Sequence, residues 1–307
     1  MKTKTWTALI ALYLIWGSTY LAIRFVVETI PPFLSAGVRF LIAGVILFVW
    51  RRLAGEPMPS ARQWRDVSIV GLLLLLGGNG LVSWAEQYVP SGATALIIGS
   101  IPIWLVLLEA LRPGGAKPGR IAILGLITGF FGIVILVGPL NLPGGEQLNP
   151  LGTAVLLLAA LLWAMGSIYS RSAEMPGSAL MTTGSQMLVG SLGLLAVSAL
   201  SGEWARFDPA SVTRQSLISL LYLIIFGSLV AFSAYAWLLR HARVSLVATY
   251  AYVNPVVAVL LGSWLADEPL NARILLAALV IIGSVVLINT IARVPKAPEA
   301  VSAEIAD

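Results

Sequence analysis

The chain has 307 residues, of which 58% are hydrophobic and only 11% are charged. A soluble domain carries about 25% charged residues, so this composition indicates an integral membrane protein and excludes an ordinary soluble domain. The net charge of +5 comes from residues at the ends of apolar segments, which form no continuous basic helix and therefore do not predict a nucleic acid partner.

Ten apolar segments are long enough to cross about 30 Å of hydrocarbon at 1.5 Å per residue. Short links rich in proline and glycine separate them. We therefore predict an all-α integral membrane protein with ten transmembrane helices, followed by a disordered cytoplasmic tail at 293–307. The helices are predicted near 6–26, 33–53, 67–88, 91–111, 120–138, 151–170, 179–200, 216–238, 244–265 and 272–291.

The first span contains the phrase IWGSTY, beginning at residue 15, and a near copy, WAMGSIY, begins at residue 163 in the sixth span. Small residues allow a neighbouring helix to approach closely. The aromatic rings can line a wet cavity, where the two copies would form two opposed gates, or they can sit in an interfacial belt. The rings concerned are Trp16, Tyr20, Trp163 and Tyr169.

The two copies are separated by about half of the chain, which indicates an internal duplication. A unit of five spans begins on one side of the membrane and ends on the other, so its second copy must run in the inverted direction. We predict two inverted five-helix repeats, at 1–142 and 143–292.

Charged side chains inside the second and third spans need a partner or water, because burying a charge in lipid is costly. Arg39 and Glu86 are both predicted in the outer third of the membrane, so we expect them to form an ion pair. Such a pair can be a gate that opens during transport or a static contact. Asn79 and Ser83 share a helical face with Glu86, and this polar face is predicted to line an aqueous pathway.

Pro102 and Pro255 occupy matching positions in the fourth and ninth spans. Each proline removes a backbone hydrogen bond, and freed carbonyls in a membrane are tolerated beside protein or water. A shared midplane cavity is one interpretation, and static bends are the other. Asn254, Tyr250 and Tyr252 place polar groups at the level of Pro255.

Lysine and arginine predict the orientation, because they are enriched in cytoplasmic loops. With the N-terminus in the cytoplasm, the cytoplasmic side receives all but five of the 19 basic residues. Both termini are therefore predicted to be cytoplasmic. The five exceptions are Arg24, Arg39, Arg206, Arg214 and Arg273.

Enzymatic function is not expected. The chain has no cysteine, which excludes thiolate metal sites and a cysteine nucleophile, and its one histidine, His241, lies in a predicted loop. No metal site and no cofactor are predicted. A phosphate-binding loop of the G-x-x-x-x-G-K-[ST] type is also missing, so this chain is not predicted to pump with ATP.

Several phrases resemble one family of carriers. ALYLIWGSTYLAIR, PPFLSAGVRFLIAG, GNGLVSWAEQYVPSGATALI and ATYAYVNPVVAVLLG, followed by DEPL, are similar to the EamA family of the drug/metabolite transporter superfamily over residues 7–291. The resemblance implies a ten-helix inner-membrane carrier that exports small metabolites, amino acids or drugs. It also implies a central cavity formed by both halves.

The sequence thus predicts a secondary transporter that moves a small-molecule solute by alternating access through a midplane cavity. An uncoupled, channel-like facilitator and a receptor or scaffold without transport are the alternatives. The glycines of GLITGFFG (125–132) allow close helix contact within a monomer or in a homodimer. Arg39, Glu86, Pro102 and Pro255 are the predicted gating or coupling residues. The predicted solute-binding residues are Trp16, Tyr20, Asn79, Ser83, Trp84, Trp104, Trp163, Tyr169, Tyr235, Tyr250, Tyr252 and Asn254.

Overall fold

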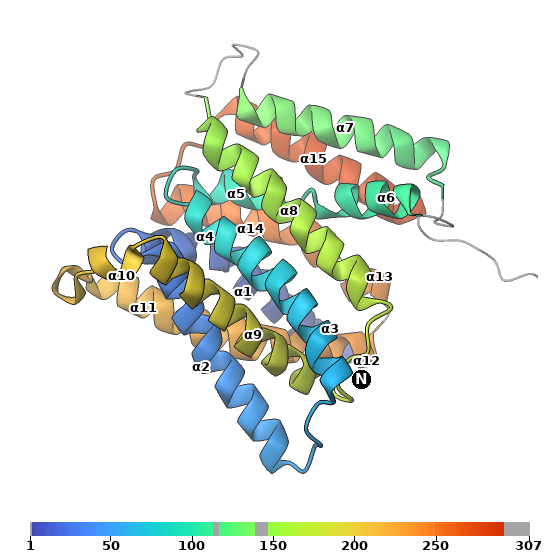
Figure 1. The fold of residues 1–307 in the computed structure, drawn as a ribbon. Coiled ribbons are helices and arrows are strands. Elements are labelled where there is room, and N and C mark those ends of the chain that lie inside the picture. The colour runs from blue at the N-terminus through green and yellow to red at the C-terminus, as the bar shows by residue number, and fades with distance from the viewer. Residues whose placement is uncertain (1, 113–116, 139–146, 243, 248, 292–307) are drawn as a thin grey trace, which may run out of the picture.

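The computed structural model describes residues 2–112, 117–138, 147–242, 244–247 and 249–291, so the tail predicted at 293–307 lies outside the described residues. Within the described ranges every regular element is a helix, which confirms the all-α prediction (Figure 1). Eight helical segments there are long and apolar enough to cross a membrane. Two further apolar helices, beginning at Tyr250 and Ala272, are shorter.

The elements follow one another in chain order as long helices, some of them divided into shorter pieces. They are α1 Lys2–Val27, α2 Pro32–Leu53, α3 Ala61–Gly71, η1 Leu72–Gly80, α4 Leu81–Ala85, α5 Ser91–Ile98, α6 Ile101–Leu111, α7 Arg120–Val137, α8 Pro150–Ser170, α9 Ala179–Leu200, α10 Glu203–Arg206, η2 Pro209–Ser211, α11 Arg214–Tyr222, η3 Leu223–Val230, α12 Ala231–His241, α13 Val244–Val247, α14 Tyr250–Leu265 and α15 Ala272–Ile291.

The third, fourth and ninth predicted spans are among those that differ from the observed helices. The third begins at Ala61, earlier than predicted, because Ser60 and Gln63 form a capping box that starts the helix in its polar part. The fourth is not one helix: α5 ends before Gly99, and α6 begins with Pro102 in its first turn, where a missing N–H costs least. The ninth is divided into the short α13 and α14.

Glycines bring two pairs of helices into close contact. In the pair α2 and α9, a Cβ on Gly44 would lie 2.9 Å from the backbone nitrogen of Leu188, and one on Gly184 would lie 2.9 Å from that of Phe48. In the pair α7 and α15, a Cβ on Gly132 would lie 2.7 Å from Ile281. The glycines of GLITGFFG therefore pack within the chain, where α7 and α15 run side by side (Figure 1).

A glutamate lies near each end of α2 and joins neighbouring segments there, on two opposite faces of the helix bundle. On the first, which we name the Glu203 face, the carboxylate of Glu203 accepts hydrogen bonds from the backbone N–H groups of Phe33 and Leu34 at the start of α2. On the second, the Glu56 face beyond the end of α2, Glu56 accepts a hydrogen bond from Ser178, the N-cap of α9. Glu203 thus satisfies N–H groups of the first turn of α2, and Glu56 positions the side chain of Ser178 that caps α9.

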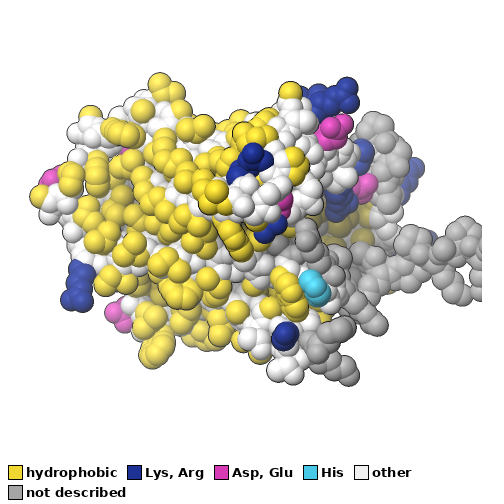
Figure 2. Space-filling view, turned by 90° about the horizontal axis from the view of Figure 1, so that it is seen from below, with side chains coloured by type: hydrophobic (Ala, Val, Ile, Leu, Met, Phe, Trp, Pro, Cys, Tyr) yellow, Lys and Arg dark blue, Asp and Glu magenta, His cyan; other side chains and the backbone are white. Residues whose placement is uncertain are grey.

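Large apolar side chains cover much of the outer surface, as the face in Figure 2 illustrates. Trp264 is 77% exposed and Leu279 is 73% exposed. Exposing such side chains to water is unfavourable, whereas in a bilayer they contact the hydrocarbon of the lipids. The exposed surface therefore agrees with the apolar helices in indicating a multi-pass membrane protein.

Candidate functional site

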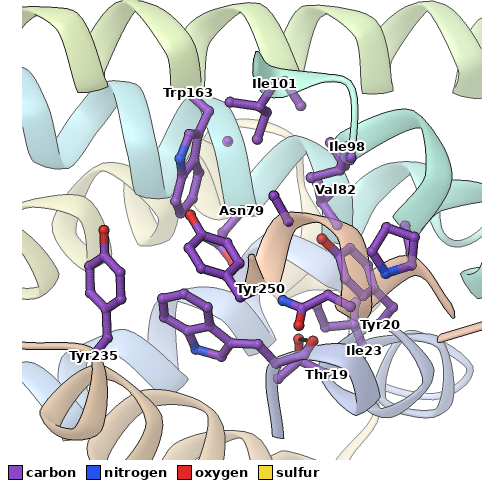
Figure 3. A pocket seen from close by; sticks show the side chains of 18 of the residues that line it. Thr19, Tyr20, Ile23, Asn79, Val82, Ile98, Ile101, Trp163, Tyr235 and Tyr250 are labelled. Atoms are coloured by element: carbon purple, nitrogen blue, oxygen red, sulfur yellow. Dashed lines mark hydrogen bonds between the residues drawn. The ribbon is translucent and has the colours of Figure 1, made fainter. Parts of the chain in front are cut away.

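A cavity of about 260 Å³ lies among the helices, and both halves of the chain line it (Figure 3). Trp163 and Tyr250, from α8 and α14, extend into the same space from opposite sides. The wall contains mainly apolar atoms with a few hydroxyl and amide groups, which is typical of sites for small organic molecules. The lining residues are Trp16, Thr19, Tyr20, Ile23, Arg39, Gly78, Asn79, Val82, Ala95, Ile98, Gly99, Ile101, Pro102, Leu105, Ala159, Trp163, Phe232, Tyr235, Val247, Tyr250, Ala251, Asn254 and Pro255.

Trp16 is the centre of an aromatic cluster on one side of the cavity. Its ring lies 5.2 Å from that of Phe232, 5.2 Å from Tyr235 and 5.1 Å from Tyr250, measured between ring centroids. The contacts with Phe232 and Tyr250 are edge-to-face, an arrangement that stabilises ring pairs. The cluster joins α1 to α12 and α14, so this wall is shared by elements from both halves of the chain.

Two π-helical segments, η1 and η3, adjoin the cavity. η1 places Gly78 and Asn79 in the wall. η3 stands behind the wall, where the carbonyl of Gly227 accepts a hydrogen bond from the Trp16 indole and the hydroxyl of Ser228 accepts one from Arg39. π-Helical turns are rare and concentrate at functional sites. Here they offer backbone and side-chain acceptors to cavity residues.

Arg39 is the charged residue of the described cavity wall. Its side chain is only 4% exposed, and its Nε donates a hydrogen bond of 2.8 Å to the hydroxyl of Ser228. The guanidinium carbon lies 4.7 Å from the ring centroid of Phe40, within cation–π range. The predicted Arg39–Glu86 ion pair is therefore wrong, because Arg39 bonds to η3 and forms no ion pair with Glu86.

The two prolines contribute to the same wall in different ways. Pro255 stays inside α14, where it denies the carbonyl of Ala251, another wall residue, its usual helical donor. Pro102 lies instead in the first turn of α6. A Cβ on Gly99 would lie 3.1 Å from the Pro255 ring, so the break between α5 and α6 packs directly against the proline of α14.

Asn254 is buried beside Pro255 and fixes the start of α14. With its amide oriented so that oxygen and nitrogen face suitable partners, the nitrogen donates to the carbonyls of Tyr13 and Tyr250, at 3.3 and 3.1 Å. The amide thus ties α14 to α1 at the cavity wall.

Of the 12 predicted solute-binding residues, the cavity wall contains seven, and a structural role is visible for several of the others. Trp84 packs against Tyr88, and Trp104 packs against Phe130. The hydroxyl of Tyr169 donates to Asp66, near the Glu56 face. The predicted residues outside the wall are Ser83, Trp84, Trp104, Tyr169 and Tyr252.

Glu86 also lies outside the cavity wall. It follows α4, one helical turn beyond the wall residue Val82, and its side chain is fully buried. Within the described residues neither carboxylate oxygen has a hydrogen-bond partner, while the backbone carbonyl of Glu86 accepts a hydrogen bond from Arg24. Removing a carboxylate from water without a partner is energetically costly.

Thr19, Ile23 and Phe232 are wall residues that the sequence interpretation missed. Thr19 and Ile23 lie three and seven positions after Trp16, which is the spacing of one helix face. That spacing was an available signal for two of them. Phe232 lies three positions before the predicted residue Tyr235, so the same spacing was available for it as well.

No group of three or more histidine, aspartate or glutamate residues is placed to hold a metal in the described part of the chain. The site offers aromatic surfaces, amide and hydroxyl groups, and one cation. These groups can bind and orient an amphipathic solute.

Comparison with known proteins relates the chain to membrane transporters. A profile of the EamA-like transporter family matches residues 4–138 and again residues 150–290. The chain is 39% identical to the uncharacterized inner membrane transporter YedA of Escherichia coli K12, over 92% of this chain and 89% of the relative.

Relatives with lower sequence identity align over a similar share of this chain. The chain is 26% identical to the uncharacterized transporter YvbV of Bacillus subtilis, over 96% of this chain and 95% of the relative. It is 26% identical to the WAT1-related protein At3g02690, chloroplastic, of Arabidopsis thaliana, over 92% of this chain and 69% of that protein. One solved protein crystal structure superimposes with a TM-score of 0.62 at 21% identity, covering 95% of this chain and 98% of the other, which supports the fold.

Proposed function

The chain belongs to the EamA-like transporter family, and from this premise we propose that it exports small organic solutes by alternating access. The observation that carries the proposal is the cavity whose wall is shared by α1, α2, α8 and α14. A wall drawn from both halves of a transporter can open to either side when the halves rock against each other.

The inverted duplication is part of this proposal. Three correspondences support it: the family profile matches each half separately, each half has a π-helical segment in its third long helix, and the two prolines meet at one cavity. The boundaries 1–142 and 143–292 place five apolar segments in each half. In this arrangement ten membrane-crossing segments form two antiparallel units.

We place the protein in the inner membrane, with the Glu56 face and both termini in the cytoplasm. The name of the YedA relative and the apolar helices support the membrane, and the excess of basic residues supports the orientation. Because the chain has no cysteine, single cysteines can test this directly. A membrane-impermeant maleimide added to intact cells should label Ser211→Cys but not Met58→Cys, and the reverse pattern would overturn the orientation.

Counterflow in proteoliposomes tests the transport mechanism. Vesicles loaded with an unlabelled solute should accumulate the labelled solute transiently, because a carrier returns its empty or exchanged site across the membrane. The panel should include amino acids, aromatic carboxylates and cationic drugs. An uncoupled channel-like facilitator would equilibrate the solute without this overshoot, and a receptor or scaffold would match empty liposomes.

A matched pair of tryptophan substitutions on α14 controls for general damage. Ala251 lies in the cavity wall, whereas Val256 is 44% exposed on the outer surface. Ala251→Trp should fill the cavity and abolish counterflow, and Val256→Trp should retain it. Equal activity of the two variants would contradict transport through this cavity.

A further inference from the structure

The single cation of the described cavity wall has no acidic partner there. Arg39 lies in the wall, and none of the ion pairs formed by described residues includes it. Its Nε is occupied by Ser228. A guanidinium has five N–H donors, so further donors remain for a ligand.

Burying the charged guanidinium of Arg39 without a bound ligand costs free energy. A charge removed from water needs compensation by an opposite charge or by several hydrogen bonds. The ring of Phe40 gives cation–π attraction but leaves the positive charge in place. Glu86, expected from the sequence as the counter-ion, is not within ion-pairing distance.

Neighbouring backbone and side-chain atoms confine the guanidinium of Arg39. A Cβ on Gly227 would lie 3.2 Å from Nη2 of Arg39 and 3.2 Å from the methyl carbon of Thr19, so the guanidinium occupies a narrow space between η3 and α1. Glycine at 227 permits this close approach. η3 therefore positions both Arg39 and, through the Gly227 carbonyl, Trp16.

The other residues of the cavity wall indicate which kind of ligand would accompany a group bound to Arg39. Aromatic rings of Trp16, Tyr235 and Tyr250 form the apolar part of the wall, and the described wall contains no carboxylate that could bind a cationic head group. An amphipathic anion matches both features, because its charge can meet Arg39 while its apolar body lies on the rings. A planar guanidinium pairs especially well with a carboxylate, through two parallel hydrogen bonds.

We propose that the transported solute carries a carboxylate that binds Arg39, with its apolar body against the Trp16 cluster. This inference rests on the proposed function, because it names the substrate class of the same cavity. Arg39 is then a solute-binding residue, and Ser228 is a positioning residue that orients it.

Compounds that differ only in their head group can measure how the charge of that group affects binding. Titration calorimetry on protein in nanodiscs should compare 3-phenylpropionate, 3-phenylpropanamide and 3-phenylpropylamine, and then butanoate, butanamide and butylamine. These compounds share a body within each series and differ in charge. We expect the wild-type protein to bind each carboxylate about tenfold or more tightly than the matched amide, and the amine least tightly.

Variants assign this preference to Arg39. Arg39→Gln should bring the carboxylate to the affinity of the amide, while Arg39→Lys should keep part of the preference through its charge. Ser228→Ala should weaken carboxylate binding less than Arg39→Gln does, because it only loosens the guanidinium. Wild-type comparison of the probes remains decisive even when Arg39→Gln does not fold.

The outcomes separate this inference from the proposed function. A wild-type preference for the amide or amine, or an unchanged carboxylate preference in folded Arg39→Gln, would overturn the assignment. Counterflow of neutral or cationic solutes without binding of any carboxylate probe would also overturn it and leave the transporter proposal standing. Failure of every solute in the broad counterflow panel would overturn the transporter proposal itself.

Discussion

The carboxylate of Glu203 accepts a hydrogen bond of 2.8 Å from the backbone N–H of Leu34, so the segment after α9 caps the first turn of α2. Its other oxygen accepts from Phe33, and Ser198 donates a further bond from within α9. A negative charge at a helix N-terminus is favourable for both hydrogen bonding and the helix dipole. The contact thus fastens α2 to the end of α9.

Replacing Glu203 with glutamine should lower the stability of the folded protein by about 1–3 kcal/mol, since a buried charge-assisted cap becomes neutral. The midpoint of thermal unfolding in detergent gives the comparison. Asp208→Asn is a suitable control, because Asp208 caps only the short exposed η2. Equal unfolding midpoints for Glu203→Gln and the wild-type protein would show that the cap is not a stabilising contact.

A second stability prediction concerns the glycine contacts between α2 and α9. Gly44→Ala should destabilise the fold by about 1–3 kcal/mol, because its new methyl group would press on the backbone of α9 and on Met187. Gly283 is also within a helix, but a Cβ there meets no atom within 4 Å. Gly283→Ala should therefore be neutral or slightly stabilising in the same unfolding measurement. Equal losses in both variants would refute the packing explanation.

Much of this fold could be predicted because the bilayer imposes long apolar helices. The positions of the helices followed from hydropathy, and the two prolines indicated where the cavity wall lies. The break at Gly99 was not predicted, because Pro102 is compatible with either a kinked helix or a new first turn. The choice depends on the packing of Gly99 against Pro255, which no local pattern reveals.

Side-chain partners were harder to predict than helix positions. Arg39 and Glu86 were paired because their depths in the membrane matched, but depth does not determine the direction in which a helix face points. Ser83 was placed in the pathway by its helical spacing from Asn79 and Glu86, but it follows the π-helical segment η1 and lies outside the cavity wall. Long-range packing decides such rotations.

Opening of the cavity towards the Glu56 face is the subject of a third prediction. The Tyr169 hydroxyl donates to Asp66 at 3.0 Å, which joins α8 to α3. Tyr169→Phe should raise the rate at which a cysteine at Ala251 reacts with an impermeant maleimide in inside-out vesicles, by about two- to tenfold, since one hydrogen bond opposes opening.

Tyr222→Phe is the matched control for this experiment, because it makes the same chemical change at a contact between α11 and Ser18 of α1. It should leave the reaction rate from the inner side unchanged. An equal increase in both variants would mean that the tyrosine contacts stabilise the fold in general and do not close this side of the cavity.

Proton coupling through Glu86 is the remaining prediction. The carboxylate is fully buried, lies one helical turn from the wall residue Val82, and has no hydrogen-bond partner within the described residues. A group placed in this way can take up a proton when the site is closed and release it when water enters. If the export is coupled to proton entry, Glu86→Gln should abolish the acceleration of transport by an imposed proton gradient, because glutamine cannot titrate. Counterflow at equal pH should remain, since exchange of solute needs no net proton movement.

Glu109→Gln serves as the control, because Glu109 pairs with Arg171 at the Glu56 face. This variant should leave gradient-driven transport unchanged. Gradient-driven transport that persists in Glu86→Gln would exclude this carboxylate as the coupling group, and a wild-type protein indifferent to the gradient would favour the uncoupled facilitator.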